Sequence, residues 1–230
     1  MAGLKHEQLG LEGGLYKPLS DADVEKISEA AFELLEKSGM AIYSDTAFEA
    51  LKSAGGAADE ETRVVRMSRS MVEDAIASNP SSITLYSRDG ENDVVLEDSR
   101  VHYGTGGTAV YVLDPDTHER RLSEVRDLIL NARLVEALGN VHLHTINVFP
   151  HDVEKREEID VNRFFHSMDH TRKHLMGGVY TLEGTRQVVR MAEMVAGGPE
   201  KLRERPFISF ITLIISPFKI DKEYGEMTCY

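Results

Sequence analysis

The stretch YGTGGT at 103–108 combines three glycines with two threonines, a composition used by loops that bind phosphate. A dinucleotide-binding fingerprint requires G-x-G-x-x-G between a strand and a helix, so that the helix N-terminus meets the pyrophosphate. Here the strand-like AVYVLD follows the glycines instead of a helix, so the pattern disfavours a phosphate loop. Two interpretations stay open: a bend that needs glycine for close backbone approach or positive φ, and a loop that contacts a ligand.

The histidines offer a second kind of chemistry, metal binding. His142 and His144 form an H-x-H pair on one face of a predicted strand, an arrangement that suits two ligands of one metal ion. The pair opens its strand, however, whereas barrel enzymes place their chemistry at the C-terminal strand ends. His166 and His170 have the H-x-x-x-H spacing of a zinc helix but lack the glutamate after the first histidine. We therefore expect no bound metal.

The composition restricts the remaining classes of site and partner. The sequence contains no G-x-S-x-G motif, and its single cysteine, Cys229, provides neither a disulfide framework nor a cysteine metal site. A net charge of -13, from 26 basic and 39 acidic residues, opposes binding to nucleic acid. The apolar runs are too short to cross a bilayer, and the first residues lack the hydrophobic core of a signal peptide. We expect a globular cytoplasmic protein without membrane or nucleic-acid partners.

The first hundred residues predict short elements that are punctuated by glycine, proline and capping serines. Residues 1–100 are therefore expected to form a small mixed α/β N-terminal cap of helices and one hairpin. The predicted elements are helices at about 21–38, 46–54 and 68–77, and strands at 83–87 and 93–97.

A repeat of about 33 residues organises the rest of the chain, 101–230. Strand-like runs begin at 109, 142, 174 and 207, and helical patterns lie between them. Strand and helix in alternation indicate a parallel sheet with helical crossovers. We interpret 101–230 as the first four strand-helix units of a (β/α)8 TIM barrel, which needs eight. The chain is thus expected to be truncated. A complete, four-stranded doubly wound sheet is the alternative.

Several stretches taken in order resemble one known family, the trimethylamine methyltransferases, which include glycine betaine methyltransferases without pyrrolysine. The most distinctive stretch is GTGGTAVYVLD, and LSDADVEKISEAAFELLEKSGM is similar to the family's N-terminal helices. The other matching stretches are SEVRDLILNARLVEALGNV, TRKHLMGG, MVAGGPEKLRERPFISF and IISPF.

The resemblance implies a TIM barrel that moves a methyl group from a methylated amine to the cobalt of a separate corrinoid protein. The amine would be trimethylamine or a quaternary amine such as glycine betaine. The corrinoid (cobalamin) would be supplied by the partner protein, and no cofactor would be bound directly. Family members are about twice this length, which agrees with four units instead of eight. Exposed edge strands on an unclosed sheet also predict pairing with another copy of the chain.

Transfer of a methyl group from a quaternary ammonium releases a neutral amine, so no general acid is required and no catalytic residue is assigned here. The site should hold a soft cation with aromatic faces, and polar groups should contact the rest of the substrate. Aromatic candidates lie near strand ends, and a substrate carboxylate would need a cation or backbone N–H groups. The predicted substrate contacts are Tyr103, Thr105, Gly106, Gly107, Thr108, Tyr111, Phe149, Lys173, Gly177 and Gly178.

Two rival functions remain at this point. A metal-dependent barrel hydrolase would use His142 and His144. A non-enzymatic domain that binds a small ligand would be complete within these 230 residues.

Overall fold

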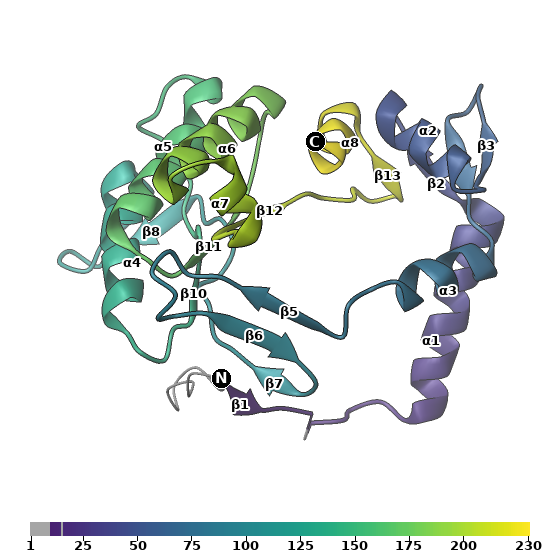
Figure 1. Cartoon of the computed structure of the whole chain (residues 1–230), viewed down its shortest axis with the longest axis horizontal. Helices are drawn as coiled ribbons and strands as arrows, with labels where there is room; N and C mark the ends of the chain where they lie inside the picture. Colours follow the sequence, from purple (N-terminus) through teal and green to yellow (C-terminus); the bar gives the residue numbers. More distant parts are fainter. Residues whose placement is uncertain (1–9, 15) are drawn as a thin grey trace. The chain divides into compact units, whose positions relative to one another are not determined.

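The computed structural model describes residues 10–14 and 16–230 (Figure 1). The chain divides into two compact units, each a mixture of helices and strands. The sheet unit comprises Met1–Gly13 and Ser81–Ile211, and the helical unit comprises Gly14–Pro80 and Thr212–Tyr230.

Serine caps begin the three predicted N-terminal helices of the helical unit. Ser20, Ser44 and Ser68 each accept a hydrogen bond from the backbone N–H three residues later, at 3.2, 3.1 and 3.3 Å. The first helical stretch ends at Gly39, where φ is 72° and a Cβ would lie 2.6 Å from the Val65 carbonyl oxygen. These helices are α1 (Asp21–Glu33), the π-helical turn η2 (Leu34–Ser38), α2 (Asp45–Ser53) and α3 (Arg69–Ala77).

A four-stranded sheet packs with these helices in the order β13-β2-β4-β3. The last strand and helix of the chain belong to this unit, because β13 pairs in parallel with β2 and α8 packs on α2. Ser44 Oγ donates to Glu226 Oε1 at 2.8 Å across that helix pair. The elements are β2 (Met40–Ile42), β3 (Ala57–Asp59), β4 (Val64–Arg66), β13 (Lys219–Ile220) and α8 (Lys222–Cys229), around a core of Met40, Ile42, Ala47, Phe48 and Val65.

The sheet unit contains the parallel strands predicted from the repeat. β10, β11 and β12 are hydrogen-bonded in sequence order, with helices between them, as the alternating pattern indicates (Figure 1). The strands are β10 (Leu143–Thr145), β11 (His174–Gly178) and β12 (Ile208–Ile211). The helices are α4 (Val125–Ala137), α5 (Arg156–His170), α6 (Leu182–Ala196) and α7 (Pro199–Glu204).

Burial alternates along residues 143–149, which contain β10, and this pattern shows which face of the sheet the helices cover. His144, Ile146 and Val148 are buried, whereas the residues between them are partly exposed. Because successive strand side chains point to opposite faces, the helices cover one face of the sheet. The other face is the one that would line the inside of a closed barrel.

The first parallel segment differs from the prediction. The glycine-rich stretch itself lies parallel to β10, with bridges from Gly104 to Leu143 and from Ala109 to Val148. The backbone N–H of Phe149 donates to the Ala109 carbonyl at 2.9 Å, which continues this pairing. The sheet therefore holds four parallel segments, and YGTGGT is the first of them instead of a bend in front of it.

The run AVYVLD instead enters an antiparallel hairpin of β8 (Tyr111–Leu113) and β9 (Arg120–Leu122). Asp114 closes the turn by accepting hydrogen bonds from the N–H groups of Asp116 and Thr117 at 3.1 and 3.2 Å. Arg121 links this turn to α4, since its guanidinium contacts Asp114 at 3.0 Å and Asp127 at 2.8 Å. The hairpin forms because a tight turn directly follows the β-prone run and brings the next residues back alongside it.

The predicted division near residue 100 differs from the two units of the structure. The hairpin of β5 (Ser82–Leu85) and β6 (Val94–Glu97) is confirmed, but it belongs to the sheet unit. The Arg88 N–H donates to the Arg172 carbonyl at 2.8 Å, and His174 Nδ1 lies 2.9 Å from the Tyr86 carbonyl. In the same unit β7 (Arg100–Val101) pairs with β1 (Leu11–Glu12).

The fourth strand also differs from the expected strand-helix unit. After β12 the chain passes into the helical unit, where β13 and α8 pack with α2 and β2, so the described chain places no helix of a fourth unit on the parallel sheet. The result is an open parallel sheet, not a closed barrel. Within the described ranges, no helix combines the length and apolarity that a membrane crossing requires.

Candidate functional site

The C-terminal ends of the parallel segments meet at one edge of the sheet unit. Ala109 lies beside Val148 there, and Gly178 lies beside Ile211. In parallel α/β folds this edge binds ligands, because the loops that follow the strands converge on it. Groups that hold a substrate are therefore expected at this edge, which we name the C-terminal rim.

A fully buried arginine from α5 ties the rim together. Arg163 is 0% exposed, and its guanidinium donates to the Gly178 carbonyl at 2.7 Å and to the Ile146 carbonyl at 3.2 Å. A third bond, 2.9 Å long, goes to the hydroxyl of Thr108. One side chain thus joins the ends of three parallel segments. Its Nε has no partner among the described residues.

The carboxylate of Asp160 sits one helical turn before Arg163 and is also 0% exposed. It accepts hydrogen bonds from the backbone N–H groups of Tyr180 and Thr181 at 3.0 to 3.1 Å, so it fixes the loop that leads into α6. Burial raises the pKa of Asp160, while these N–H groups and the charge of Arg163 act in the opposite direction. Burial lowers the pKa of Arg163, and attraction to Asp160 opposes that shift. Both charged groups thus have their hydrogen-bond partners within the protein.

Two aromatic rings lie at the same rim. The rings of Phe149 and Tyr180 are 5.7 Å apart and inclined by 78°, an edge-to-face arrangement. Phe149 also stacks edge-on with His151 at 4.9 Å, and the guanidinium of Arg163 lies 5.1 Å from the centre of the Tyr180 ring. Both aromatic residues are partly exposed. Such rings can offer negative faces to a cationic ligand.

The predicted glycine-rich contacts fall on the first parallel segment. Gly104 requires glycine, because a Cβ would lie 2.9 Å from the Leu143 side chain. Gly106 and Gly107 are different: no heavy atom lies within 4 Å of a Cβ added at either position, and neither has positive φ. The packing of the described chain therefore does not explain glycine at these two positions. Thr105 donates its hydroxyl hydrogen to the Thr145 carbonyl.

The remaining predicted contacts lie in varied places. Gly177 packs against α5, since a Cβ there would be 2.8 Å from the Phe164 ring. Tyr103 is 53% exposed and lies at the start of the first segment, away from the rim. Tyr111 belongs to the β8–β9 hairpin, where the Arg120 guanidinium lies 4.6 Å from its ring centre.

Lys173 is placed at the opposite edge of the sheet from the rim, directly before β11. Its buried amine donates to the carbonyls of Val135, Leu138 and Val141 at 2.7, 2.6 and 2.6 Å. These carbonyls belong to the last turn of α4, to its C-cap Leu138 and to the loop that follows. The amine of Lys173 is therefore bound to backbone carbonyls in this structure, and its contact with a substrate carboxylate stays a prediction of the sequence.

Asp160, Arg163 and Tyr180 were not predicted from the sequence as site residues. A signal for the first two exists, because they occupy core positions of α5 together with Phe164, Ser167 and Met168, all of them buried. A charged pair at i and i+3 inside an apolar helical stripe indicates buried charges with a structural or functional task. Tyr180 has no comparable signal.

The histidine alternative receives no support from the geometry. Within residues 10–14 and 16–230, no three His, Cys, Asp or Glu side chains gather as metal ligands would. His142 Nδ1 accepts a hydrogen bond from the Tyr103 N–H at 3.0 Å. His144 is fully buried, and its burial, with a further contribution from Arg163, lowers its pKa to about 4.

The sequence similarities agree with the resemblance drawn from YGTGGTAVYVLD and the stretches after it. The trimethylamine methyltransferase MttB of Desulfitobacterium hafniense (strain DSM 10664 / DCB-2) is 34% identical over 221 residues, which cover 96% of this chain and 43% of that protein. The glycine betaine methyltransferase of D. hafniense (strain Y51) is 27% identical over 219 residues, covering 94% and 44%. The trimethylamine methyltransferase MttB of Methanosarcina thermophila is 24% identical over 221 residues, covering 92% and 44%.

The chain thus spans less than half the length of these relatives. The family described as "Trimethylamine methyltransferase (MTTB)" matches residues 6–228, which is nearly the whole chain and both of its units. The chain therefore belongs to the trimethylamine methyltransferase (MTTB) family.

Proposed function

We propose that this chain is part of a methyltransferase that takes a methyl group from a methylated amine and passes it to the cobalt of a separate corrinoid protein. The amine is trimethylamine or a quaternary amine such as glycine betaine. The family match over residues 6–228 is the observation that supports this proposal. The corrinoid is the acceptor and belongs to the partner protein, so no cofactor is assigned to this chain.

The reaction determines what the site must provide. The methyl carbon leaves its nitrogen, the C–N electron pair stays on the nitrogen, and the amine departs without needing a proton from an acid. The protein therefore has to hold a cation, orient one methyl group outward and exclude water. Aromatic faces hold a methylated ammonium with about 0.5 to 2 kcal/mol per ring. The rings of Phe149 and Tyr180 at the C-terminal rim fit this task.

The charges beneath these rings also suit a cationic substrate. An isolated buried arginine would repel an ammonium ion, but Asp160 lies one turn away on α5 and attracts Arg163. The guanidinium donates its hydrogen bonds to Thr108, Ile146 and Gly178. Arg163 is accordingly a positioning residue that holds the strand ends. Its charge and that of Asp160 largely offset each other, so the protein beneath the substrate has almost no net charge.

The open space at Gly106 and Gly107 supports a ligand there. Since neither glycine is required by packing or by positive φ, we assign the space above them to the substrate or to the acceptor that approaches it. Backbone N–H groups in this segment and at Gly178 would suit a substrate carboxylate. The proposed contacts are Thr105, Gly106, Gly107, Thr108, Phe149, Gly178 and Tyr180.

Calorimetric titration of the chain with glycine betaine and with trimethylamine tests this assignment. Phe149→Leu and Tyr180→Leu should each weaken binding roughly 2- to 30-fold, the equivalent of one cation–aromatic contact. Tyr111→Leu is the matched control, because Tyr111 is an exposed aromatic residue of the β8–β9 hairpin and is not one of the proposed contacts. Equal losses in all three variants, or no binding of either amine at millimolar concentration, would count against the proposed site.

Methyl transfer itself is tested with reduced free cobalamin as acceptor and by following its absorbance. Transfer that requires the amine, and that Phe149→Leu slows at amine concentrations below saturation, supports the function. A cytoplasmic location and pairing with another copy of the chain stay predictions of the sequence.

A further inference from the structure

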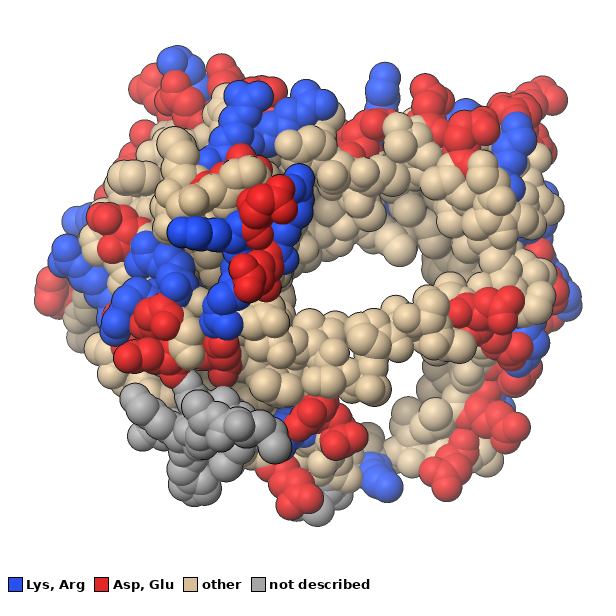
Figure 2. All heavy atoms as spheres, in the orientation of Figure 1, with Lys and Arg blue, Asp and Glu red and all other residues tan. Residues whose placement is uncertain are grey.

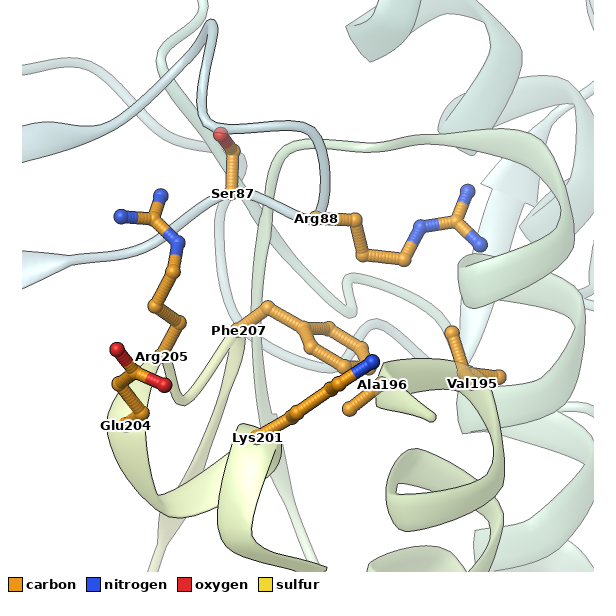
Figure 3. Close-up of a pocket in the computed structure, with 8 residues that line it drawn as sticks. All are labelled: Ser87, Arg88, Val195, Ala196, Lys201, Glu204, Arg205 and Phe207. Carbon is orange, nitrogen blue, oxygen red and sulfur yellow. The ribbon is translucent and has the colours of Figure 1, made fainter. Parts of the chain in front are cut away.

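A second concave site lies at the opposite edge of the parallel sheet from the C-terminal rim. It is a cavity of about 300 Å³, near the lower limit for small-molecule sites (Figure 3). Phe207, which directly precedes β12, forms part of its wall, and Arg88 is anchored there through its N–H bond to the Arg172 carbonyl. The lining residues are Ser87, Arg88, Val195, Ala196, Lys201, Glu204, Arg205 and Phe207.

The apolar part of the cavity is a fixed surface. Phe207 is only 3% exposed, and Val195 and Ala196 come from the last turn of α6. Figure 3 shows Arg88 and Lys201 reaching toward the Phe207 and Val195 side, whereas Arg205 lies on the side of Glu204. A ligand here would therefore meet an apolar wall and two cationic groups together.

The charges of the lining residues are not balanced internally. Arg205 is neutralised, since its guanidinium lies 2.7 Å from Asp93 Oδ2 and also covers the Tyr86 ring at 4.5 Å. Arg88 is different, because its guanidinium donates to the Thr171 carbonyl at 3.2 Å and pairs with no carboxylate of the described chain. The side-chain amine of Lys201 has no hydrogen-bond or ion-pair partner among the described residues, and only its backbone carbonyl is used, by the Arg205 N–H. After the Arg205 pair is removed, two cations face the single carboxylate of Glu204.

This excess of positive charge contrasts with the chain as a whole, in which 39 acidic residues outnumber 26 basic ones. Figure 2 shows acidic and basic side chains interleaved over the part of the surface that carries α6 and α7. Long cationic side chains in such a surface usually find carboxylate neighbours, as Arg203 does with Glu200 on the same helix. Arg88 and Lys201 form no ion pair of this kind in the described chain, although Glu204 lies in the same cavity lining.

We propose that this cavity binds a small organic anion, whose carboxylate or phosphate group contacts Arg88 and Lys201 and whose apolar body lies on Phe207 and Val195. The anionic group of the ligand would form the ion pairs that the side chains of Arg88 and Lys201 do not form within the described chain. The apolar wall selects a ligand with a ring or a short aliphatic chain over an inorganic ion. This site is separate from the proposed methylamine site in position and in the sign of its ligand.

Titration of the 230-residue chain with benzoate, with phenyl phosphate and with uncharged benzyl alcohol tests the proposal. These probes share one ring, so they separate the contribution of the charge from that of the apolar body. We expect at least one anion to bind roughly tenfold or more tightly than benzyl alcohol, and its affinity to fall with added salt. The tighter of the two anions identifies the head group. Binding of inorganic phosphate as tightly as phenyl phosphate would overturn the role of the apolar wall.

Variants locate the binding within the cavity. Lys201→Gln and Arg88→Gln should each weaken the anion roughly fivefold or more. Arg203→Gln is the matched control, because Arg203 lies on the same helix, is exposed and does not line the cavity. Lys201 and Arg203 are both exposed, so these two variants keep the fold, which a thermal melt verifies. Equal affinities in Lys201→Gln and Arg203→Gln, or no anion binding at millimolar concentration, would overturn the proposal.

Discussion

Replacing Arg163 with methionine should reveal how strongly the C-terminal rim depends on one buried charge. Methionine keeps an unbranched side chain of comparable length and removes the guanidinium. Three acceptors at the ends of three parallel segments then lose their donor: Gly178 O, Ile146 O and the Thr108 hydroxyl. Asp160 stays buried and loses the cation that attracts it.

No ion pair joins Arg163 to Asp160 in the described chain, so the expected loss follows from the three hydrogen bonds of the guanidinium. Leaving a buried acceptor without its donor costs about 1 to 3 kcal/mol, so the three together should cost at least about 3 kcal/mol. At about 2 to 4 °C per kcal/mol for a chain of this size, the melting temperature should fall by roughly 10 °C. The chain has no tryptophan, so far-ultraviolet circular dichroism in urea or during heating is the suitable readout.

The pH dependence separates the charge effect from simple loss of packing. Arg163 holds the pKa of Asp160 down against the effect of burial, so its removal raises that pKa further. A carboxyl whose pKa is higher in the folded than in the unfolded state loses stability as pH rises through the folded value. Arg163→Met should therefore be more damaging at pH 7 than at pH 5, and Asp160→Asn in the same chain should recover part of the loss.

Arg190→Met is the control for this experiment. Arg190 is exposed on α6 and pairs with no carboxylate of the described chain. Its replacement should change the free energy of unfolding by no more than about 0.5 kcal/mol. If Arg163→Met cost no more than Arg190→Met, the guanidinium of Arg163 could not be what holds the rim together. An equal effect at both pH values would exclude the contribution of the Asp160 charge.

Three further predictions concern single sites. The wild-type chain should become less stable between pH 7 and pH 5, and about 2 kcal/mol of that decrease should be absent in His144→Gln. The reason is that His144 has a pKa of about 4 in the folded state, so between these pH values only the unfolded chain takes up its proton. Urea unfolding at both pH values measures the difference. Lys173→Met should lower the free energy of unfolding by about 3 kcal/mol, since three carbonyls lose their donor, yet leave the affinity for methylated amines unchanged in calorimetry. Gly177→Ala should cost about 1 to 3 kcal/mol by overpacking, whereas Gly106→Ala should leave stability within about 0.5 kcal/mol and still weaken amine binding; the reverse order would refute the assigned roles.

Local features of the chain could be predicted well from the sequence. Ser20 and Ser68 begin their helices, and Gly197, at φ 84°, ends α6, because caps depend on a few neighbouring residues. The start of α4 is less readable from the sequence: its N-cap is Glu124, while the hydroxyl of the adjacent Ser123 donates to the Phe149 carbonyl at 2.6 Å. That hydroxyl serves a contact 26 residues away, which spacing alone does not reveal.

Pairing between distant segments accounts for most of the other differences. AVYVLD has high β-propensity and was predicted as a parallel strand, but its turn at Asp114 makes the local hairpin available first. The glycines of YGTGGT have low β-propensity, yet the neighbouring strand provides partners at Leu143 and Val148. Lys173 was predicted as a contact because a substrate carboxylate needs a cation, whereas in the structure its amine donates to carbonyls of α4 and of the residues that follow this helix.

The two edges of the parallel sheet are prepared electrostatically for opposite ligands. At the C-terminal rim the buried cation of Arg163 is attracted by Asp160 and bound by backbone carbonyls, so a cationic ligand would contact mainly the aromatic rings. At the other edge Arg88 and Lys201 form no ion pair with a carboxylate of the described chain, so their charges attract an anion and repel a cation. A methylated amine and an organic anion should therefore bind without competing. Because glycine betaine carries both charges, its quaternary nitrogen favours the rim, and competition with benzoate would show whether its carboxylate also reaches the second cavity.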